Sequence, residues 1–291
     1  MKKLLLALIP LAILFLIVSF FIPVKLNNQL PVANTLSNIQ TALQPQNLAK
    51  WDTSGRKLSI TPVSYMLYQL EATKDDHSEI FGLMILPNAG KDLSRSGIVY
   101  SRMTNLFYKL FPFLEKRSFA TATINELRSY LDDDHRFYGF PIEIKPAADT
   151  LFLTKKQDLP ANQLFTSLPL MQRELEDYAK QNNCRVLAKN ISFSSLDHDS
   201  LAVMVGLNID KVIAGDYIYN FRQLPANAAL ATGHYAGPFR GRTALYQAME
   251  KYLMDHQLAK RALPYETYHS PFPDSDSANI DIELLYPVAR Q

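Results

Sequence analysis

The chain has 291 residues, of which 47% are hydrophobic and 20% are charged, so it is long enough for two ordinary domains and has the composition of a folded protein. Its formal net charge is only +2, and the basic residues are spread out rather than gathered in a block, so we expect no nucleic-acid partner. The single cysteine, Cys184, excludes an intramolecular disulfide and any zinc site built from several thiolates.

The first predicted element is an apolar run at the N-terminus. Residues Leu4 to Val24 carry no charge, and about 20 such residues are enough for a helix to cross a hydrocarbon core of about 30 Å. A cleaved signal peptide is the alternative, but its apolar core is about 7–15 residues long and this run lacks a small-x-small cleavage site. We therefore expect a transmembrane anchor at 1–24, in a single-pass membrane protein. Because Lys2 and Lys3 precede the run, we expect the N-terminus to be cytoplasmic and the soluble domains to lie on the outer or periplasmic side.

Residues 25–137 are predicted to form a strand, two short helices, an antiparallel strand meander and a long closing helix. The meander is indicated by stretches rich in aromatic and branched residues at 58–72, 80–86 and 97–110. The closing helix is indicated by helical spacing of apolar residues from about Ala120 to Leu131. This order, with Trp51 just before the meander, resembles START or polyketide-cyclase-like (SRPBCC) domains. The resemblance implies a helix-grip fold with an apolar cavity under the last helix.

The C-terminal half contains two copies of one unit, from about Ile142 to Ile209 and from about Phe221 to Val288. Each copy is predicted as β-α-β-β, so the fold class of the chain is α+β. Two such units placed side by side share one sheet, with both helices on one side. The other face then forms a concave groove near the pseudo-twofold axis, which is the kind of surface where ligands bind.

Three segments of the second copy carry a family resemblance. They read His-Tyr-Ala-Gly-Pro-Phe at 234–239, Pro-Tyr-Glu-Thr-Tyr at 264–268 and Glu-Leu-Leu-Tyr-Pro-Val at 283–288. Together they resemble the GyrI-like domains, also known as the effector-binding domains of AraC and MerR-type regulators, and place such a domain at 139–291. The first copy lacks these marks, with Met204 opposite Glu283. The resemblance implies a cleft that takes small molecules, often aromatic or cationic.

The acidic residue of the last strand is the main candidate for ligand binding. Apolar residues alternate with Glu283, so Glu283 should point into the groove when they face the helices. Its carboxylate would pair with a cation, and nearby tyrosines would add cation–π attraction; the alternative is a solvated residue on an open sheet face. Tyr265, Tyr268 and Tyr235 are secondary candidates, with wall packing as the alternative, and Thr267 shares a face with Tyr265.

These observations predict a membrane-anchored protein that binds a small molecule in the cleft of its C-terminal domain. The alternative is a GyrI-like hydrolase of reactive small molecules that uses the cleft glutamate and a tyrosine for acid–base chemistry. We favour a non-enzymatic binding protein, and we expect no cofactor and no metal. Transcriptional regulation is not favoured, because the sequence has no candidate helix-turn-helix.

Overall fold

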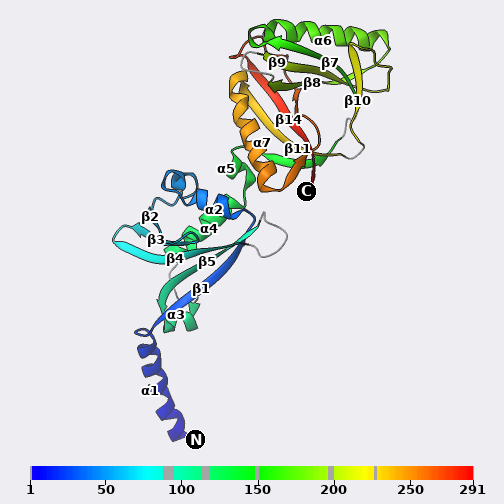
Figure 1. The fold of residues 1–291 in the computed structure, drawn as a ribbon. Coiled ribbons are helices and arrows are strands. Elements are labelled where there is room, and N and C mark those ends of the chain that lie inside the picture. The colour runs from blue at the N-terminus through cyan, green and yellow to red at the C-terminus, as the bar shows by residue number, and fades with distance from the viewer. Residues whose placement is uncertain are drawn as a thin grey trace. The chain divides into compact units, whose positions relative to one another are not determined.

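A computed structural model describes residues 2–87, 95–112, 118–147, 151–195, 200–225 and 228–290 (Figure 1). The chain divides into two compact units, Met1–Asp133 and Asp134–Gln291. Each unit is built on its own antiparallel sheet with helices packed against it. The mixed α+β class predicted from the sequence is therefore confirmed, whereas the N-terminal transmembrane helix is not.

The N-terminal apolar run does not form the predicted membrane-spanning helix. Helix α1 (Lys2–Ser19) ends before the run does, and Pro23 and Val24 already belong to strand β1. From Leu4 to Ser19 the helix rises about 24 Å, which is short of a hydrocarbon core of about 30 Å. Among the described residues, no helix has both the length and the apolar character needed to cross a membrane. The predicted anchor at 1–24 is therefore wrong, as are the single-pass topology and the cytoplasmic and periplasmic placements that depended on it.

The first unit is a five-stranded antiparallel sheet in the order β1-β5-β4-β3-β2. Its strands are β1 (Pro23–Val32), β2 (Lys57–Pro62), β3 (Leu67–Lys74), β4 (His77–Pro87) and β5 (Ser96–Asn105). Its helices beyond α1 are α2 (Leu36–Ala42), η1 (Pro45–Lys50), α3 (Leu106–Leu110) and α4 (Phe119–Leu131). The predicted stretch 58–72 divides into β2 and β3, and the stretch 97–110 forms nearly all of β5 followed by α3.

Helix α4 supplies the apolar stripe that covers this sheet. Ile124, Leu127 and Leu131 are fully buried, and the side chain of Ser118 caps the helix by accepting a hydrogen bond from the Thr121 amide. Trp51 is also fully buried, and its indole N–H donates to the carbonyl oxygen of Ala42 at 2.8 Å. The buried indole thereby joins the turn after η1 to the end of α2.

The second unit contains a nine-stranded antiparallel sheet in the order β10-β7-β9-β8-β13-β14-β11-β6, with β12 pairing with β14 outside this path. Its strands are β6 (Ile142–Pro146), β7 (Leu151–Pro160), β8 (Val186–Ser195), β9 (Ser200–Ile209), β10 (Tyr219–Gln223), β11 (Ala229–Pro238), β12 (Leu258–Lys260), β13 (Tyr265–Tyr268) and β14 (Asn279–Arg290). Its helices are α5 (Asp134–Tyr138), η3 (Ala161–Gln163), α6 (Leu164–Gln181), η4 (Phe239–Arg242) and α7 (Thr243–Asp255).

Two β-α-β-β units make up most of this sheet, β7-α6-β8-β9 and β11-α7-β13-β14. They meet where β8 pairs with β13. The short strand that precedes each copy joins the outer edge of the other copy: β6 pairs with β11, and β10 pairs with β7. We call this arrangement the edge-strand exchange.

Helices α6 and α7 cover the same face of the sheet (Figure 1). Alternate residues of the strands pack beneath them. Leu153, Ile191 and Ile282 belong to this buried layer, as do Leu175 from α6 and Leu245 from α7. Because side chains alternate along a strand, the intervening residues point to the opposite face. We call this opposite face the groove face.

Candidate functional site

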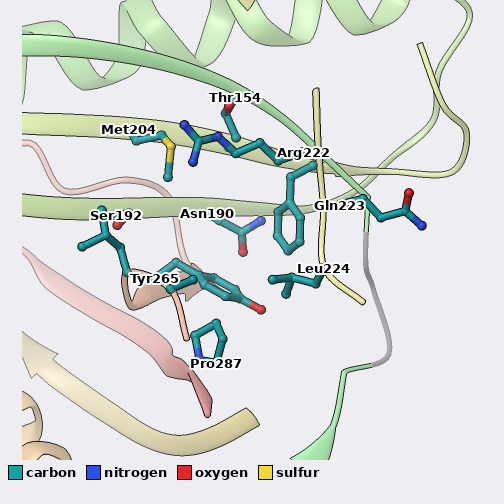
Figure 2. A pocket seen from close by; sticks show the side chains of 13 residues that line it. Thr154, Asn190, Ser192, Met204, Arg222, Gln223, Leu224, Tyr265 and Pro287 are labelled. Atoms are coloured by element: carbon teal, nitrogen blue, oxygen red, sulfur yellow. The ribbon is translucent and has the colours of Figure 1, made fainter. Parts of the chain in front are cut away.

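A cavity of about 520 Å³ opens on the groove face of the second unit (Figure 2). It lies mainly over the strands of the first copy, and strand β13, the end of β14 and the segment before β13 close its other side. Its lining residues are Phe152, Thr154, Asn190, Ser192, Met204, Gly206, Arg222, Gln223, Leu224, Ala262, Leu263, Tyr265 and Pro287. This volume is typical of sites for small organic molecules.

Two aromatic rings form the apolar wall of the cavity. Phe152 on β7 and Tyr265 on β13 meet edge to face, with ring centroids 5.4 Å apart. Behind Tyr265 lies a small apolar cluster that includes Leu230 and Leu285. The two rings come from different copies of the repeat, so the wall exists only because both copies share one sheet.

Three buried polar side chains in the lining are held in place by partners of their own. Thr154 donates its hydroxyl to the carbonyl oxygen of Asn220 at 3.1 Å, and Ser192 donates to that of Pro264 at 2.6 Å. The side chain of Asn190 donates to Asn208 and accepts from the hydroxyl of Thr267 at 2.6 Å. Since both hydroxyl protons are already engaged, Thr154 and Ser192 present mainly acceptor lone pairs to the cavity.

Arg222 is the only charged side chain among the described residues that line the cavity. It stands on the edge strand β10, directly opposite Phe152 on β7. Figure 2 shows its guanidinium group extending past Thr154 toward Met204. Arg222 is exposed, so the charge lies at the mouth of the cavity.

Tyr265 and Thr267 lie at the cavity among the residues singled out by sequence. Tyr265 lines it, and Thr267 supports Asn190 from the neighbouring strand. Glu283 lies opposite Thr267 on β14, outside the lining, with a side chain 25% exposed. Its carboxylate forms an ion pair with Lys145 on β6. The structure therefore brings Glu283 near the cavity but already gives it a cationic partner.

Tyr268 and Tyr235 lie on the helix side of the sheet, away from the cavity. Tyr268 is one residue out of step with Tyr265 and Thr267, so alternation turns it to the other face. It is 7% exposed and donates its hydroxyl to the carboxylate of Glu266. Tyr235 donates to the carbonyl oxygen of Pro238 at 2.7 Å.

Sequence reasoning missed a buried polar network around Glu266. This carboxylate is fully buried and accepts hydrogen bonds from Arg242 at 2.9 Å, from Tyr246 at 2.8 Å and from Tyr268. Burial, followed by the nearby Glu266 carboxylate, raises the pKa of the Tyr246 and Tyr268 hydroxyls well above their ordinary value. The signal was present in the sequence, because Glu266 alternates with Tyr265 and Thr267 and so has to face the helices.

Sequence reasoning also missed most of the cavity lining, because the first copy lacks the family marks. Phe152, Asn190, Ser192, Met204 and Arg222 all belong to the first copy or to the strand added to its edge. Strand alternation would have placed the first four on the groove face. The position of Arg222 depends on the pairing of β10 with β7, which no local pattern indicates.

Comparison with solved structures gives a likeness of fold over about half of the chain. No protein-family profile matches the chain, and no curated protein matches it in sequence. The cryo-EM structure of an EcmrR–DNA complex matches with a TM-score of 0.44 and 14% identity, over 52% of this chain and 58% of that one. The crystal structure of the EcmrR C-terminal domain matches with a TM-score of 0.44 and 15% identity, over 52% of this chain and 99% of that one. A hydrolase from Listeria innocua matches with a TM-score of 0.37 and 12% identity, over 51% of this chain and 91% of that one.

The chain thus spans a little over half the length of the protein in the EcmrR–DNA complex. All three TM-scores lie below 0.5, so these likenesses carry no argument about function. They give no support to the START-like resemblance of residues 25–137.

Proposed function

We propose that the C-terminal unit binds a small, largely apolar molecule in the cavity on its groove face. The observation that carries this proposal is the cavity itself, about 520 Å³ in volume and walled by Phe152 and Tyr265. Its buried polar side chains are fixed by hydrogen bonds to the protein, so little side-chain freedom remains to be lost on binding. Apolar walls with a few fixed polar groups are the usual composition of a small-molecule site.

The finer expectation, a cationic ligand held by Glu283, remains a hypothesis within this proposal. For Glu283 to bind a cation, its ion pair with Lys145 would have to open. Both side chains are partly exposed, so opening costs on the order of 1 kcal/mol or less. A ligand whose aromatic ring packs against Tyr265 can bind without opening this ion pair.

The hydrolase alternative finds little support in the cavity. A general base has to lie within hydrogen-bond reach of the proton that it removes. The described lining residues include no carboxylate and no imidazole that could act as such a base. We therefore favour binding without turnover, and any hydrolysis of a reactive ester by the purified chain would count for the alternative.

The proposal is tested with the neutral aromatic probe N-phenyl-1-naphthylamine, whose fluorescence rises in apolar sites. The full chain should bind it, and Tyr265→Ala should weaken binding by about tenfold because one aromatic wall is lost. Tyr217→Ala is the matched control, since Tyr217 is 93% exposed in the same unit. Absence of saturable binding, or an equal effect of both substitutions, would count against the cavity as the site.

A further inference from the structure

Within the described part of the chain, Arg222 has no acidic partner, unlike Lys145 and His234 on the same face. Glu283 pairs with Lys145, and Asp281 lies 2.8 Å from a ring nitrogen of His234. In the part of the chain that the structure describes, Arg222 forms no ion pair. The cavity mouth therefore carries a positive charge that its own lining does not neutralise.

The second copy of the repeat contains the counterpart of Arg222. Strands β7 and β11 are both ten residues long and occupy equivalent places in the two copies. In the strand register, Arg222 stands opposite the second residue of β7, Phe152. Lys145 stands opposite the second residue of β11, Leu230. Each cation thus stands on an exchanged edge strand, at the same position relative to its copy.

The acidic partner is present in one copy and missing in the other. In the strand register, Glu283 stands opposite the sixth residue of β11, His234. Met204 stands opposite the sixth residue of β7, Lys156. Met204 is therefore the counterpart of Glu283. Where the second copy has the ion pair of Lys145 and Glu283, the first copy has Arg222 extending toward a methionine (Figure 2).

From this asymmetry we infer that the cavity binds a small aromatic carboxylate, with the anion at Arg222 and the ring against Phe152 and Tyr265. The inference rests on the proposed function and specifies the class of its ligand. A guanidinium group offers a planar fork of N–H donors that matches a carboxylate. The ligand's carboxylate would occupy the place that the Glu283 side chain takes in the other copy.

The other groups near the cavity agree with this orientation. Lys156, opposite Met204, faces the same side of the sheet, and its nearest acid, Asp158, is 3.8 Å away with both side chains exposed. No acidic residue is among the described lining residues. Thr154 and Ser192 direct their protons to backbone carbonyl oxygens, so they do not donate to an anion, and that role falls chiefly to Arg222.

The test uses three probes of one shape: 2-naphthoate, neutral 2-naphthamide and cationic (2-naphthylmethyl)ammonium. Each displaces N-phenyl-1-naphthylamine from the full chain, and the dissociation constants are compared. We expect 2-naphthoate to bind about fivefold more tightly than 2-naphthamide, the scale of an exposed ion pair, and the ammonium probe to bind most weakly. The preference should shrink between 0.05 and 1 M salt, because screening shortens the range of the charge.

Two substitutions locate the effect. In Arg222→Gln the ratio of the naphthamide and naphthoate constants should fall to about one, whereas Arg173→Gln, an exposed arginine on α6, should leave it unchanged. Met204→Glu should restore the missing acid, pair with Arg222 and abolish the preference for 2-naphthoate. Met204→Gln has the same size without the charge and should keep that preference.

The outcomes separate the inference from the proposed function. If the neutral probe binds and Tyr265→Ala weakens it, but naphthoate gains nothing over naphthamide, the cavity is a binding site and the anion inference is wrong. A naphthoate preference that survives Arg222→Gln, or that disappears equally in Met204→Glu and Met204→Gln, also overturns the inference. Failure of all probes to bind overturns both.

Discussion

The buried network around Glu266 gives the sharpest prediction about stability. Replacing Arg242 with methionine removes the guanidinium group that donates to the Glu266 carboxylate at 2.9 Å. Glu266 is fully buried and the Arg242 side chain is 15% exposed, so water cannot replace the lost partner without opening the core. The substitution keeps an unbranched side chain in contact with Phe239, over whose ring the guanidinium carbon lies at 3.4 Å.

The expected cost follows from what remains around the carboxylate. Breaking a buried ion pair by removing one partner costs about 3–5 kcal/mol, because the other charge is left uncompensated. Tyr246 and Tyr268 still donate to Glu266, and each hydrogen bond to a charged group contributes about 1.5–3 kcal/mol. We therefore expect the lower end of the range, a loss of about 3 kcal/mol in the free energy of unfolding.

The measurement is urea unfolding followed by far-ultraviolet circular dichroism, with the cost taken from the shift of the midpoint and the slope. Arg240→Met is the matched control, because Arg240 lies two residues away and is exposed, so it should change stability by less than about 0.5 kcal/mol. Adding Glu266→Gln to Arg242→Met removes the unpaired charge and should recover at least about 1 kcal/mol. Equal effects of Arg242→Met and Arg240→Met, or a further loss in the double variant, would refute the reasoning.

Two further substitutions test other parts of the chain. Trp51→Phe should lower the free energy of unfolding of the first unit by about 2 kcal/mol, because it leaves a void and removes the 2.8 Å hydrogen bond to Ala42. A melting temperature equal to that of the unsubstituted chain would show that the indole is dispensable. Lys145→Met should cost less than about 1 kcal/mol, since the ion pair with Glu283 is partly exposed, but it should tighten binding of (2-naphthylmethyl)ammonium about threefold by freeing the carboxylate. If calorimetry finds no gain for the cation, Glu283 does not reach the ligand.

Local periodicity in the sequence was enough to anticipate the mixed α+β class and which face of β13 carries Tyr265 and Thr267. Alternation along β13 places Tyr265 and Thr267 on one face, and the structure has one lining the cavity and the other supporting Asn190. The same alternation would have excluded Tyr268, whose tyrosine ring looked suitable but whose position has the opposite parity.

Long-range pairing explains what local patterns did not predict. Lys145 precedes Glu283 by 138 residues, and only the pairing of β6 with β11 brings the two together. Arg222 reaches the cavity for the same reason, through the pairing of β10 with β7. In the N-terminal apolar run, hydropathy alone did not indicate where the helix ends. The apolar residues continue to Val24, but the helix ends at Ser19 and the remaining residues lead into a strand.

The edge-strand exchange makes the cavity depend on the order in which the chain emerges during synthesis. When the first copy is complete at Ile209, strand β7 has an open edge, since β10 has yet to be made. An unpaired strand edge readily accepts a strand from another molecule. A nascent or truncated chain that ends there would therefore be prone to pair with a second copy. Swapping β10 between two full chains would give a dimer in which the Arg222 of each chain lines the cavity of the other.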